Sequence, residues 1–206
     1  MIAVAGIVAG SVFTSNAQIA IGLTGGFGSP MGDMASKDKF SLGNGFGGGL
    51  SGRYFLNDNM AVGLNIGYYS FSFHDVPPAI TSNSYYNLPI TAAFDYYFMD
   101  EGFKPYAGLE LGYIHTSYKL TQDVSGVSVD IKGSKGGLLF APVVGVAYEL
   151  NDNLDILLNA KYMYGLTEGK TDLEMTASGQ SQTTSVDYYN TTFLNVNLGV
   201  SYRLSN

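Results

Sequence analysis

One short motif in the sequence has the residue types of a nucleophilic catalyst. The chain contains two histidines, His74 and His115, and His115-Thr116-Ser117 places a histidine two residues before a serine. On an extended strand both side chains would lie on the same face. A histidine activates a serine when an acid orients it, but alternation places Glu110 on the opposite face. We therefore expect no catalytic residues, with His115 an interfacial aromatic residue and His74 a polar residue near a loop.

Charged residues within the alternating segments are the other set that could do chemistry. They share the face opposite the large aliphatic side chains: Arg53, Asp95, Glu110, Glu149, Lys161 and Arg203, with Asp155 close to a turn. Buried charges without partners are costly, so we expect a salt-bridged, hydrogen-bonded network. For Asp155 the alternative is that it faces the periplasm beside its turn. The chain has no cysteine, no metal cluster and no glycine-rich phosphate loop, so we expect no metal site and no cofactor.

The segments that carry these residues are predicted to be β-strands. In the segment 193–204, apolar side chains alternate without a break with polar residues or glycine from Leu194 onward. A period of two indicates a strand with one apolar and one polar face. The same period recurs to give about eight strands, the other seven near residues 19–27, 46–56, 62–68, 86–98, 107–113, 140–150 and 154–164.

Short turns and long polar loops alternate between these strands. Tight turns are predicted at 57–59, 99–102 and 151–153, and long loops at 29–41, around 75–78, at 121–136 and at 167–187. The stretch 121–136 is a candidate hairpin with Ser125-Gly126 at its tip. Pro77 and Pro78 exclude a ladder strand at the second loop, because proline lacks the amide hydrogen.

The direction of the apolar face decides between two kinds of barrel. A soluble, lipocalin-like barrel would hold the aliphatic side chains inside, around an apolar ligand, and the charges outside. Here the charged face is also the Gly-, Ser- and Asn-rich one, which suits the narrow interior of a small barrel. Only 13% of residues are charged, against about 25% in ordinary domains. We therefore predict an all-β, eight-stranded, antiparallel up-and-down transmembrane β-barrel. Tyr69, Phe71 and Phe73 break the apolar phase, which indicates a bulge or a strand continuing past the membrane.

The first 17 residues are predicted to be an export signal. Residues 1–13 are a short apolar run, and Ser15-Asn16-Ala17 supplies the small residues of a cleavage site, so the barrel domain would occupy 18–206. No Lys or Arg precedes the run, which leaves a misassigned start codon or a truncated signal as alternatives. A buried N-terminal strand or helix is the alternative to a signal. No apolar run reaches the length of about 18 residues that a transmembrane helix needs.

The pattern resembles the small outer-membrane β-barrel family that includes the OmpA transmembrane domain and OmpX. The resemblance rests on the segment 105–113, on the turns Leu56-Asn57-Asp58-Asn59 and Leu150-Asn151-Asp152-Asn153, and on the closing segment 200–204. It implies location in the outer membrane of a Gram-negative cell, contact with outer-membrane lipid and lipopolysaccharide, and insertion by the barrel-assembly machinery. Many members end on an aromatic residue, whereas this chain ends Leu204-Ser205-Asn206, so that assembly signal is shifted or weaker here.

The function expected from these features is structural. The barrel would be a scaffold with a side-chain-filled, non-channel lumen, a monomer whose long loops serve surface interaction or envelope integrity. The alternatives are a small or gated porin-like pore, a soluble lipocalin-like barrel, and an outer-leaflet lipid-modifying enzyme. The enzyme alternative rests on the His-x-Ser spacing, which is similar to that of lipid A deacylase barrels. The net charge of −7 argues against nucleic acid as a partner.

Overall fold

The computed structural model describes residues 18–73, 80–124, 127–177 and 180–204. Within these ranges it has one short 3₁₀ helix, η1 (Gly32–Met34), and ten strands: β1 (Ile19–Pro30), β2 (Leu42–Asn57), β3 (Met60–Phe73), β4 (Ile80–Tyr97), β5 (Phe103–Val124), β6 (Val127–Asn151), β7 (Leu154–Leu166), β8 (Gly169–Ala177), β9 (Gln180–Tyr188) and β10 (Thr191–Leu204). The predicted signal segment, His74, the Pro77-Pro78 loop and the Ser125-Gly126 tip lie outside the described residues.

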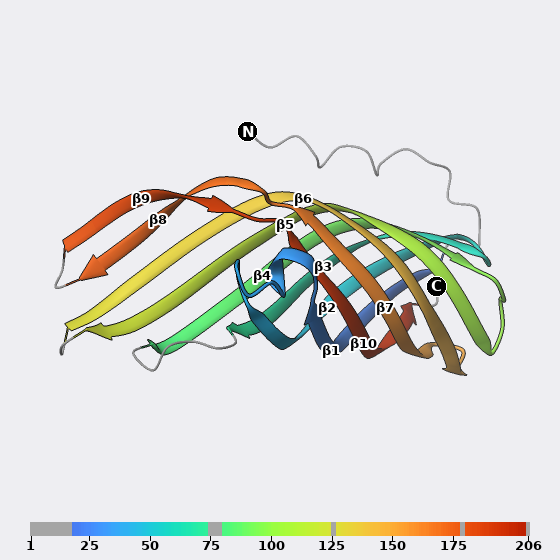
Figure 1. Cartoon of the computed structure of the whole chain (residues 1–206). Helices are drawn as coiled ribbons and strands as arrows, with labels where there is room; N and C mark the ends of the chain where they lie inside the picture. Colours follow the sequence, from blue (N-terminus) through green and yellow to red (C-terminus); the bar gives the residue numbers. More distant parts are fainter. Residues whose placement is uncertain (1–17, 74–79, 125–126, 178–179, 205–206) are drawn as a thin grey trace.

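Eight of the strands close into a barrel. Neighbouring strands follow the order β5-β4-β3-β2-β1-β10-β7-β6, and β5 also pairs with β6 to complete the ring (Figure 1). Every pairing around the ring is antiparallel. The first and last strands lie side by side, with Ile19 opposite Leu204. The predicted eight-stranded antiparallel barrel is confirmed.

Short turns gather at one end of the barrel, which we call the turn end. The side chain of Asn57 accepts hydrogen bonds from the backbone amides of Asn59 and Met60, at 3.0 and 2.9 Å. Asn151 accepts one from the amide of Asn153 at 3.0 Å. Asparagine favours such turns because its side chain can bond to the backbone two residues on. The repeated Asn-Asp-Asn sequence therefore builds the same turn twice.

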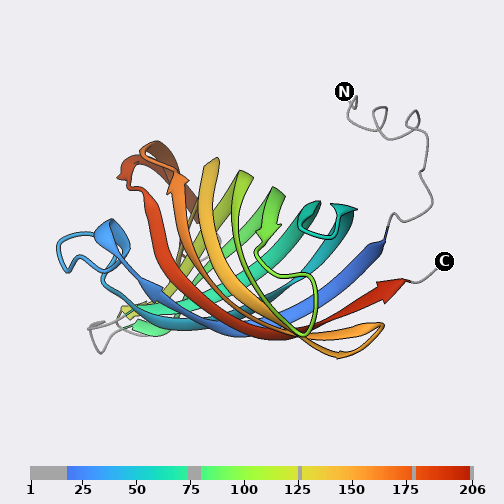
Figure 2. The ribbon, with the colours of Figure 1, turned by 90° about the vertical axis from the view of Figure 1, so that its right-hand side faces the viewer.

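The segment predicted as the longest loop is instead a β-hairpin. β8 and β9 pair with each other along their whole length, and β8 also pairs with β6 opposite Val129–Lys132. These strands extend the barrel wall at the end opposite the turns, which we call the loop end (Figures 1 and 2). The prediction of a loop was wrong because Ser, Thr and Gln occupy both faces of β9, and the apolar alternation in β8 covers only Leu173, Met175 and Ala177.

The large aliphatic side chains point outward over the middle of the barrel. Leu64 and Leu138 are each 68% exposed, and Leu198 is 61% exposed. We call this outward-facing surface the apolar band. The opposite face is buried, as Asn87, Thr91 and Glu110 show. The facial assignment with aliphatics outside and polar groups inside is thus confirmed. No helix in the described ranges is long and apolar enough to cross a membrane.

Toward the loop end the two faces of the strands exchange character: apolar side chains point inward and polar ones outward. Tyr69 and Phe71 point inward, with exposures of 3% and 2%, while outward positions become polar, as with Lys119. β3 runs unbroken through this change, and the irregular pairing lies in β2 between Leu42 and Gly45. The aromatic residues of β3 therefore mark a strand that continues beyond the apolar band, and the alternative of a bulge in this strand is wrong.

Candidate functional site

The barrel interior is the place where polar and charged side chains converge. Inward residues of β5 sample its layers in turn: Lys104 near the turn end, then Tyr106, Glu110 and Ile114, and finally Tyr118 near the loop end. Side chains from the other strands of the ring complete each layer. The chemistry of the lumen therefore changes along the barrel axis.

A charge cluster lies at the turn end. Lys104 Nζ is 3.1 Å from both Glu149 Oε2 and Asp155 Oδ1. Arg203 donates from Nη2 to the two carboxylate oxygens of Asp155 at 2.8 and 2.9 Å. The cluster borders an open, polar cavity of about 340 Å³ at the mouth of the barrel. Two cations thus neutralise two carboxylates where the lumen meets solvent.

An aromatic layer follows the charge cluster. The rings of Phe55 and Tyr97 are 5.6 Å apart, and those of Tyr97 and Tyr106 are 5.1 Å apart. Val143 and Leu157 pack in the same cluster. This layer separates the charges at the mouth from the polar groups further in.

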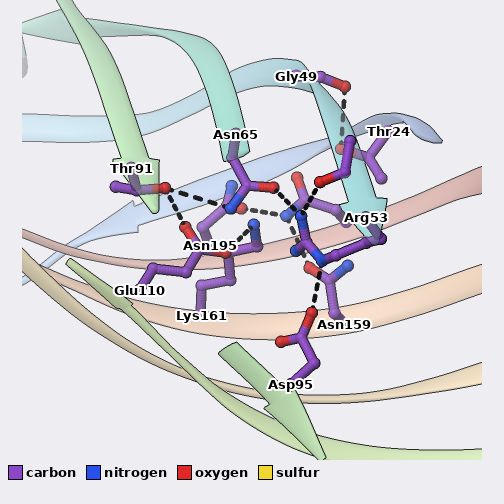
Figure 3. A network of polar contacts seen from close by, with 12 residues as sticks. Thr24, Gly49, Arg53, Asn65, Thr91, Asp95, Glu110, Asn159, Lys161 and Asn195 are labelled. Atoms are coloured by element: carbon purple, nitrogen blue, oxygen red, sulfur yellow. Dashed lines mark hydrogen bonds and ion pairs between the residues drawn. The ribbon is translucent and has the colours of Figure 1, made fainter. Parts of the chain in front are cut away.

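A belt of polar side chains crosses the middle of the lumen (Figure 3). Arg53 donates from Nε to Asp95 Oδ2 at 2.5 Å and from Nη1 to Asn65 Oδ1 at 2.7 Å. Asn65 donates to Thr91 Oγ1 at 3.2 Å, and Thr91 donates to Glu110 Oε2 at 2.8 Å. One chain of hydrogen bonds thus links the four neighbouring strands β2, β3, β4 and β5.

The belt continues on the far side of the lumen. Lys161 Nζ, from β7, lies 2.6 Å from Glu110 Oε1. Asn197 donates to Asn159 at 3.0 Å and contacts Asn195, which in turn donates to the backbone oxygen of Phe27 at 3.2 Å. The remaining cavity beside these groups is about 50 Å³, which is room for little more than ordered water.

The structure brings all six residues of the predicted network into contact with an opposite charge, but in two clusters. Arg53 with Asp95 and Lys161 with Glu110 lie in the belt, while Arg203 lies with Glu149 and Asp155 at the mouth. Asp155 is 4% exposed and pairs with Lys104 and Arg203, beside the open cavity at the mouth of the barrel. Four cations and four carboxylates meet in the lumen, because Lys104 joins the six predicted residues and Asp155.

Lys104 is the lumen charge that the sequence reasoning missed. The predicted fifth strand began at residue 107, whereas β5 begins at Phe103. Lys104 is six residues before Glu110, an even spacing that places both on the same face of a strand. Extending the alternation toward the preceding turn would have found it.

An aromatic plug fills the lumen at the loop end. The largest fully buried side chains of the described structure gather here, among them Tyr85, Tyr188, Phe71 and Phe193. Tyr188 donates to the Tyr85 hydroxyl at 3.1 Å, and its oxygen lies 2.6 Å from Thr116 Oγ1. The plug therefore combines ring packing with hydrogen bonds between hydroxyl groups.

The β1–β2 connection and the β8–β9 hairpin both contribute side chains to this plug. Phe40, from the connection between β1 and β2, packs edge-on against Tyr85 and Tyr188, with ring centroids 5.4 and 5.1 Å apart. Tyr188 itself ends β9, the second strand of the hairpin. The β1–β2 connection and the hairpin are thus fastened to the barrel wall from inside.

Charged pairs outside the apolar band are exposed and local. Thr121 donates to Asp130 at 2.9 Å, and this bond together with Lys119 lowers the pKa of the Asp130 carboxyl. Lys39 donates to Asp33 at 2.5 Å, which raises the pKa of Lys39. These pairs are screened by solvent and add little to stability.

The His-x-Ser pair lies on the outer surface, away from the lumen. His115 is exposed and Ser117 is half-buried, both on the outward face of β5. Glu110 is buried inside and paired with Lys161. Within the described ranges no hydrogen bond or ion pair joins His115 to an acid, and no group of three potential metal ligands is present. The orienting acid that an activated serine needs is therefore not part of this arrangement.

A closed antiparallel ring, an outer apolar band and a polar interior together define a membrane-spanning β-barrel of the outer-membrane type. The model of the family described as "Outer membrane protein beta-barrel domain" matches residues 1–204. The chain belongs to this family and is located in the cell outer membrane. In such barrels the short turns face the periplasm and the longer loops face outward, so the turn end is periplasmic and the loop end extracellular.

Solved structures with this fold come from several bacteria. A major outer membrane protein from Thermus thermophilus is similar with a TM-score of 0.67 at 16% identity, over 92% of this chain and 100% of that one. OprG from Pseudomonas aeruginosa has a TM-score of 0.54 at 20% identity, over 91% and 96%. The protease OmpT from Escherichia coli has a TM-score of 0.54 at 10% identity, over 95% and 99%. No curated protein sequence matches the chain. At these identities the likeness shows the fold alone.

Proposed function

We propose that this protein is a non-enzymatic scaffold of the outer membrane whose lumen is closed and whose extracellular strands and loops carry out surface interaction or support the envelope. The observation that carries the proposal is the filling of the lumen at successive levels. In this proposal the apolar band contacts membrane lipid and lipopolysaccharide, the barrel-assembly machinery inserts the chain, and the barrel is a monomer.

The belt and the plug support a closed lumen. The Arg53–Asp95 and Lys161–Glu110 pairs cross the middle of the barrel, and aromatic rings fill its extracellular half. Paired charges leave no excess of one sign to attract an ion, and solute channels need barrels of about 16 strands. Passage of a solute would require both levels to rearrange.

The extracellular architecture supports an outward-facing role. β5, β6 and the β8–β9 hairpin extend beyond the apolar band as one continuous sheet (Figure 1). Phe40 and Tyr188 hold the loops against the barrel wall. Recognition residues are often carried by loops on a rigid framework, which this arrangement provides.

A small or gated pore is the second candidate. It is favoured by the cavity of about 340 Å³ at the periplasmic mouth, which shares Phe55, Tyr97 and Asp155 with the lining of the smaller cavity beside the belt. In this candidate the plug would act as the gate. The two candidates differ in whether removal of the plug opens the barrel.

Single-channel recording in planar bilayers tests the proposal. We expect no conductance steps from the folded wild-type protein, and none from the variant Phe40→Ala/Tyr188→Ala, because the belt still closes the lumen. Heat-modifiable mobility in SDS verifies that each sample is folded before recording. Discrete steps from the wild type, or steps that appear only in the variant, would show an open or a gated pore and contradict the closed scaffold.

A further inference from the structure

Two cavities in the periplasmic half of the lumen lie on either side of the aromatic layer. The outer cavity, of about 340 Å³, opens at the mouth of the barrel, and the inner cavity, of about 50 Å³, lies beside the polar belt. Phe55, Tyr97 and Asp155 line both cavities. These three side chains therefore form the partition between the mouth and the belt.

The inner cavity contains a buried hydrogen-bond acceptor without a partner. Asp95 lines this cavity and is 1% exposed. One carboxylate oxygen accepts from Arg53 at 2.5 Å, whereas the other, Oδ1, has no hydrogen-bond partner among the described residues. In Figure 3 this second oxygen points away from Arg53. Buried polar groups in folded proteins are nearly always hydrogen-bonded, so Asp95 Oδ1 requires a donor that the described side chains do not supply.

The charges beside the inner cavity select a neutral donor. Arg53 pairs with Asp95, Lys161 pairs with Glu110, and Asp155 pairs with the two cations at the mouth. An additional ion would be a buried charge without a counter-charge, which is costly. A water molecule needs about 10–15 Å³ of cavity volume and donates two hydrogen bonds, so the inner cavity has room for a few molecules.

Polar side chains around the inner cavity can hold these molecules. Ser51, Asn159 and Ser201 line it together with Asp95. An ordered internal water typically makes about three hydrogen bonds, and the hydroxyl and amide groups supply the partners that Asp95 alone does not. The cavity thus has both the size and the chemistry of a site for water.

Phe55 is the side chain of the partition that is best placed to move. It is half-buried, whereas Tyr97 is 7% exposed, and the two rings are 5.6 Å apart. Phe55 also lies beside an irregularity of the β2–β3 ladder, which shifts register between Phe55 and Asn57. Exposed side chains change rotamer within picoseconds to nanoseconds. Rotation of the Phe55 ring into the outer cavity would connect the inner cavity to the periplasm.

The route from the inner cavity to the cell surface is obstructed at two levels. The belt crosses the lumen first, through the Arg53–Asp95 and Lys161–Glu110 pairs. The aromatic plug then fills the extracellular half with fully buried rings. A molecule beside Asp95 would have to pass both levels to reach the surface, but only the aromatic layer to reach the periplasm.

We propose that the inner cavity is a blind pocket filled from the periplasm, in which small neutral hydrogen-bond donors, water above all, bind Asp95, and that Phe55 controls their entry. The inference rests on the proposed closed lumen and adds a binding site and a side of entry to it. Asp95 is the acceptor, and the neighbouring hydroxyl and amide groups hold the same molecules. The lumen is therefore open to small polar molecules up to the belt and closed beyond it.

A single thiol can report on the inner cavity because the chain has no cysteine. Ser51→Cys places a thiol in the cavity lining. The full-length protein in lipid nanodiscs is treated with methyl methanethiosulfonate, a small neutral reagent, and mass spectrometry follows the modification. We expect this reagent to modify the folded protein completely. A maleimide that carries a pyrene group should fail to do so, because it is too large for the pocket.

Further substitutions in the Ser51→Cys background locate the entrance. Phe55→Ala should accelerate modification at least about tenfold, and Phe55→Trp should slow it, because the side chain at this position controls entry. The plug variant Phe40→Ala/Tyr188→Ala should leave the rate within about twofold, because the belt still separates the plug from the pocket. Every variant should keep the mobility shift on heating, which shows that the barrel remains folded.

NMR of the wild-type protein in nanodiscs detects the water itself. Nε–H of Arg53 donates to Asp95, so a water molecule bound to this carboxylate lies close to that proton. We expect cross-relaxation between water and the Arg53 Nε–H in the deuterated protein. No such transfer is expected at the hydroxyl of Tyr85, which lies in the plug.

Three results would overturn the inference: a folded Ser51→Cys protein that stays unmodified even with Phe55→Ala, faster modification in the plug variant than in Phe55→Ala, or no water signal at Arg53. Each of these can occur while the barrel remains non-conducting. Conductance steps together with entry controlled by Phe55 would instead contradict the closed scaffold alone, so the two failures are distinguishable.

Discussion

Glu110 is the residue that connects the two ion pairs of the polar belt. It is 2% exposed and accepts from Thr91 on one oxygen and from Lys161 on the other, at 2.8 and 2.6 Å. Thr91 connects it to Asn65, which contacts Arg53. A single carboxylate therefore couples the two ion pairs of the belt across the lumen.

Replacement of Glu110 by alanine should destabilise the barrel. Glu110→Ala leaves the Lys161 ammonium buried without its partner, and breaking a buried pair typically costs about 3–5 kcal/mol. We expect a lower melting temperature and a lower free energy of unfolding in urea titrations of the protein in detergent. The double variant Glu110→Ala/Lys161→Met should recover most of the loss, because it removes the stranded charge. An unchanged melting temperature in the single variant would refute the stabilising role of this pair.

Alternation alone predicted which charged residues within the strands face inward, because successive side chains of a strand always point to opposite faces. Arg53, Asp95 and Glu110 all lie inside on this basis. The alternation does not predict which inward groups pair with each other, because the partners come from different strands. The relative stagger of those strands is set by the closed ring. This is why the two separate clusters were not predicted. Lys104 was missed for a different reason, namely a strand boundary placed too late.

At the scale of the strand, the apolar band is defined by the run of outward aliphatic residues. On β3 the outward residues are Val62, Leu64, Ile66 and Tyr68, and beyond Tyr68 the outward positions become serine. Tyrosine suits the membrane–water interface because its ring is apolar and its hydroxyl polar. Leu64 therefore lies well inside the band.

A lysine should be tolerated outside the band but not within it. Leu64→Lys places a charge in the hydrocarbon and should cost about 2–4 kcal/mol. Ser134→Lys, at an exposed outward position of β6 beyond the band, should cost almost nothing. Equilibrium folding into lipid vesicles measures both. Equal stabilities for the two variants would contradict the placement of the band.

The elements that the sequence did not predict share a physical cause. Strands within the membrane show one apolar and one polar face, so their period of two is visible. β8 and β9 stand in water on most of their surface. Ser, Thr and Gln occupy both faces of β9, and the alternation in β8 is confined to Leu173, Met175 and Ala177, so the pattern is short and weak. Tyr69, Phe71 and Phe73 did mark the change in the sequence. Where β3 leaves the membrane, the apolar residues move from the outward positions of the strand to the inward ones.

At the scale of the molecule, closure depends on residues far apart in the sequence. β1 pairs with β10 from Ile19 opposite Leu204 to Pro30 opposite Phe193. This seam removes the last free edge of the ring, which an open sheet would expose to lipid at high cost. The β8–β9 hairpin leaves its edge outside the membrane, where water can satisfy its backbone groups.

The most direct test of the closed barrel is the mobility of the protein from a washed outer-membrane fraction in SDS electrophoresis, boiled against unboiled. A closed barrel with every ring strand paired resists SDS until it is heated, so we predict two distinct mobilities. A protein absent from the membrane fraction, with a single mobility under both conditions, would contradict both ring closure and the outward orientation of the aliphatic residues.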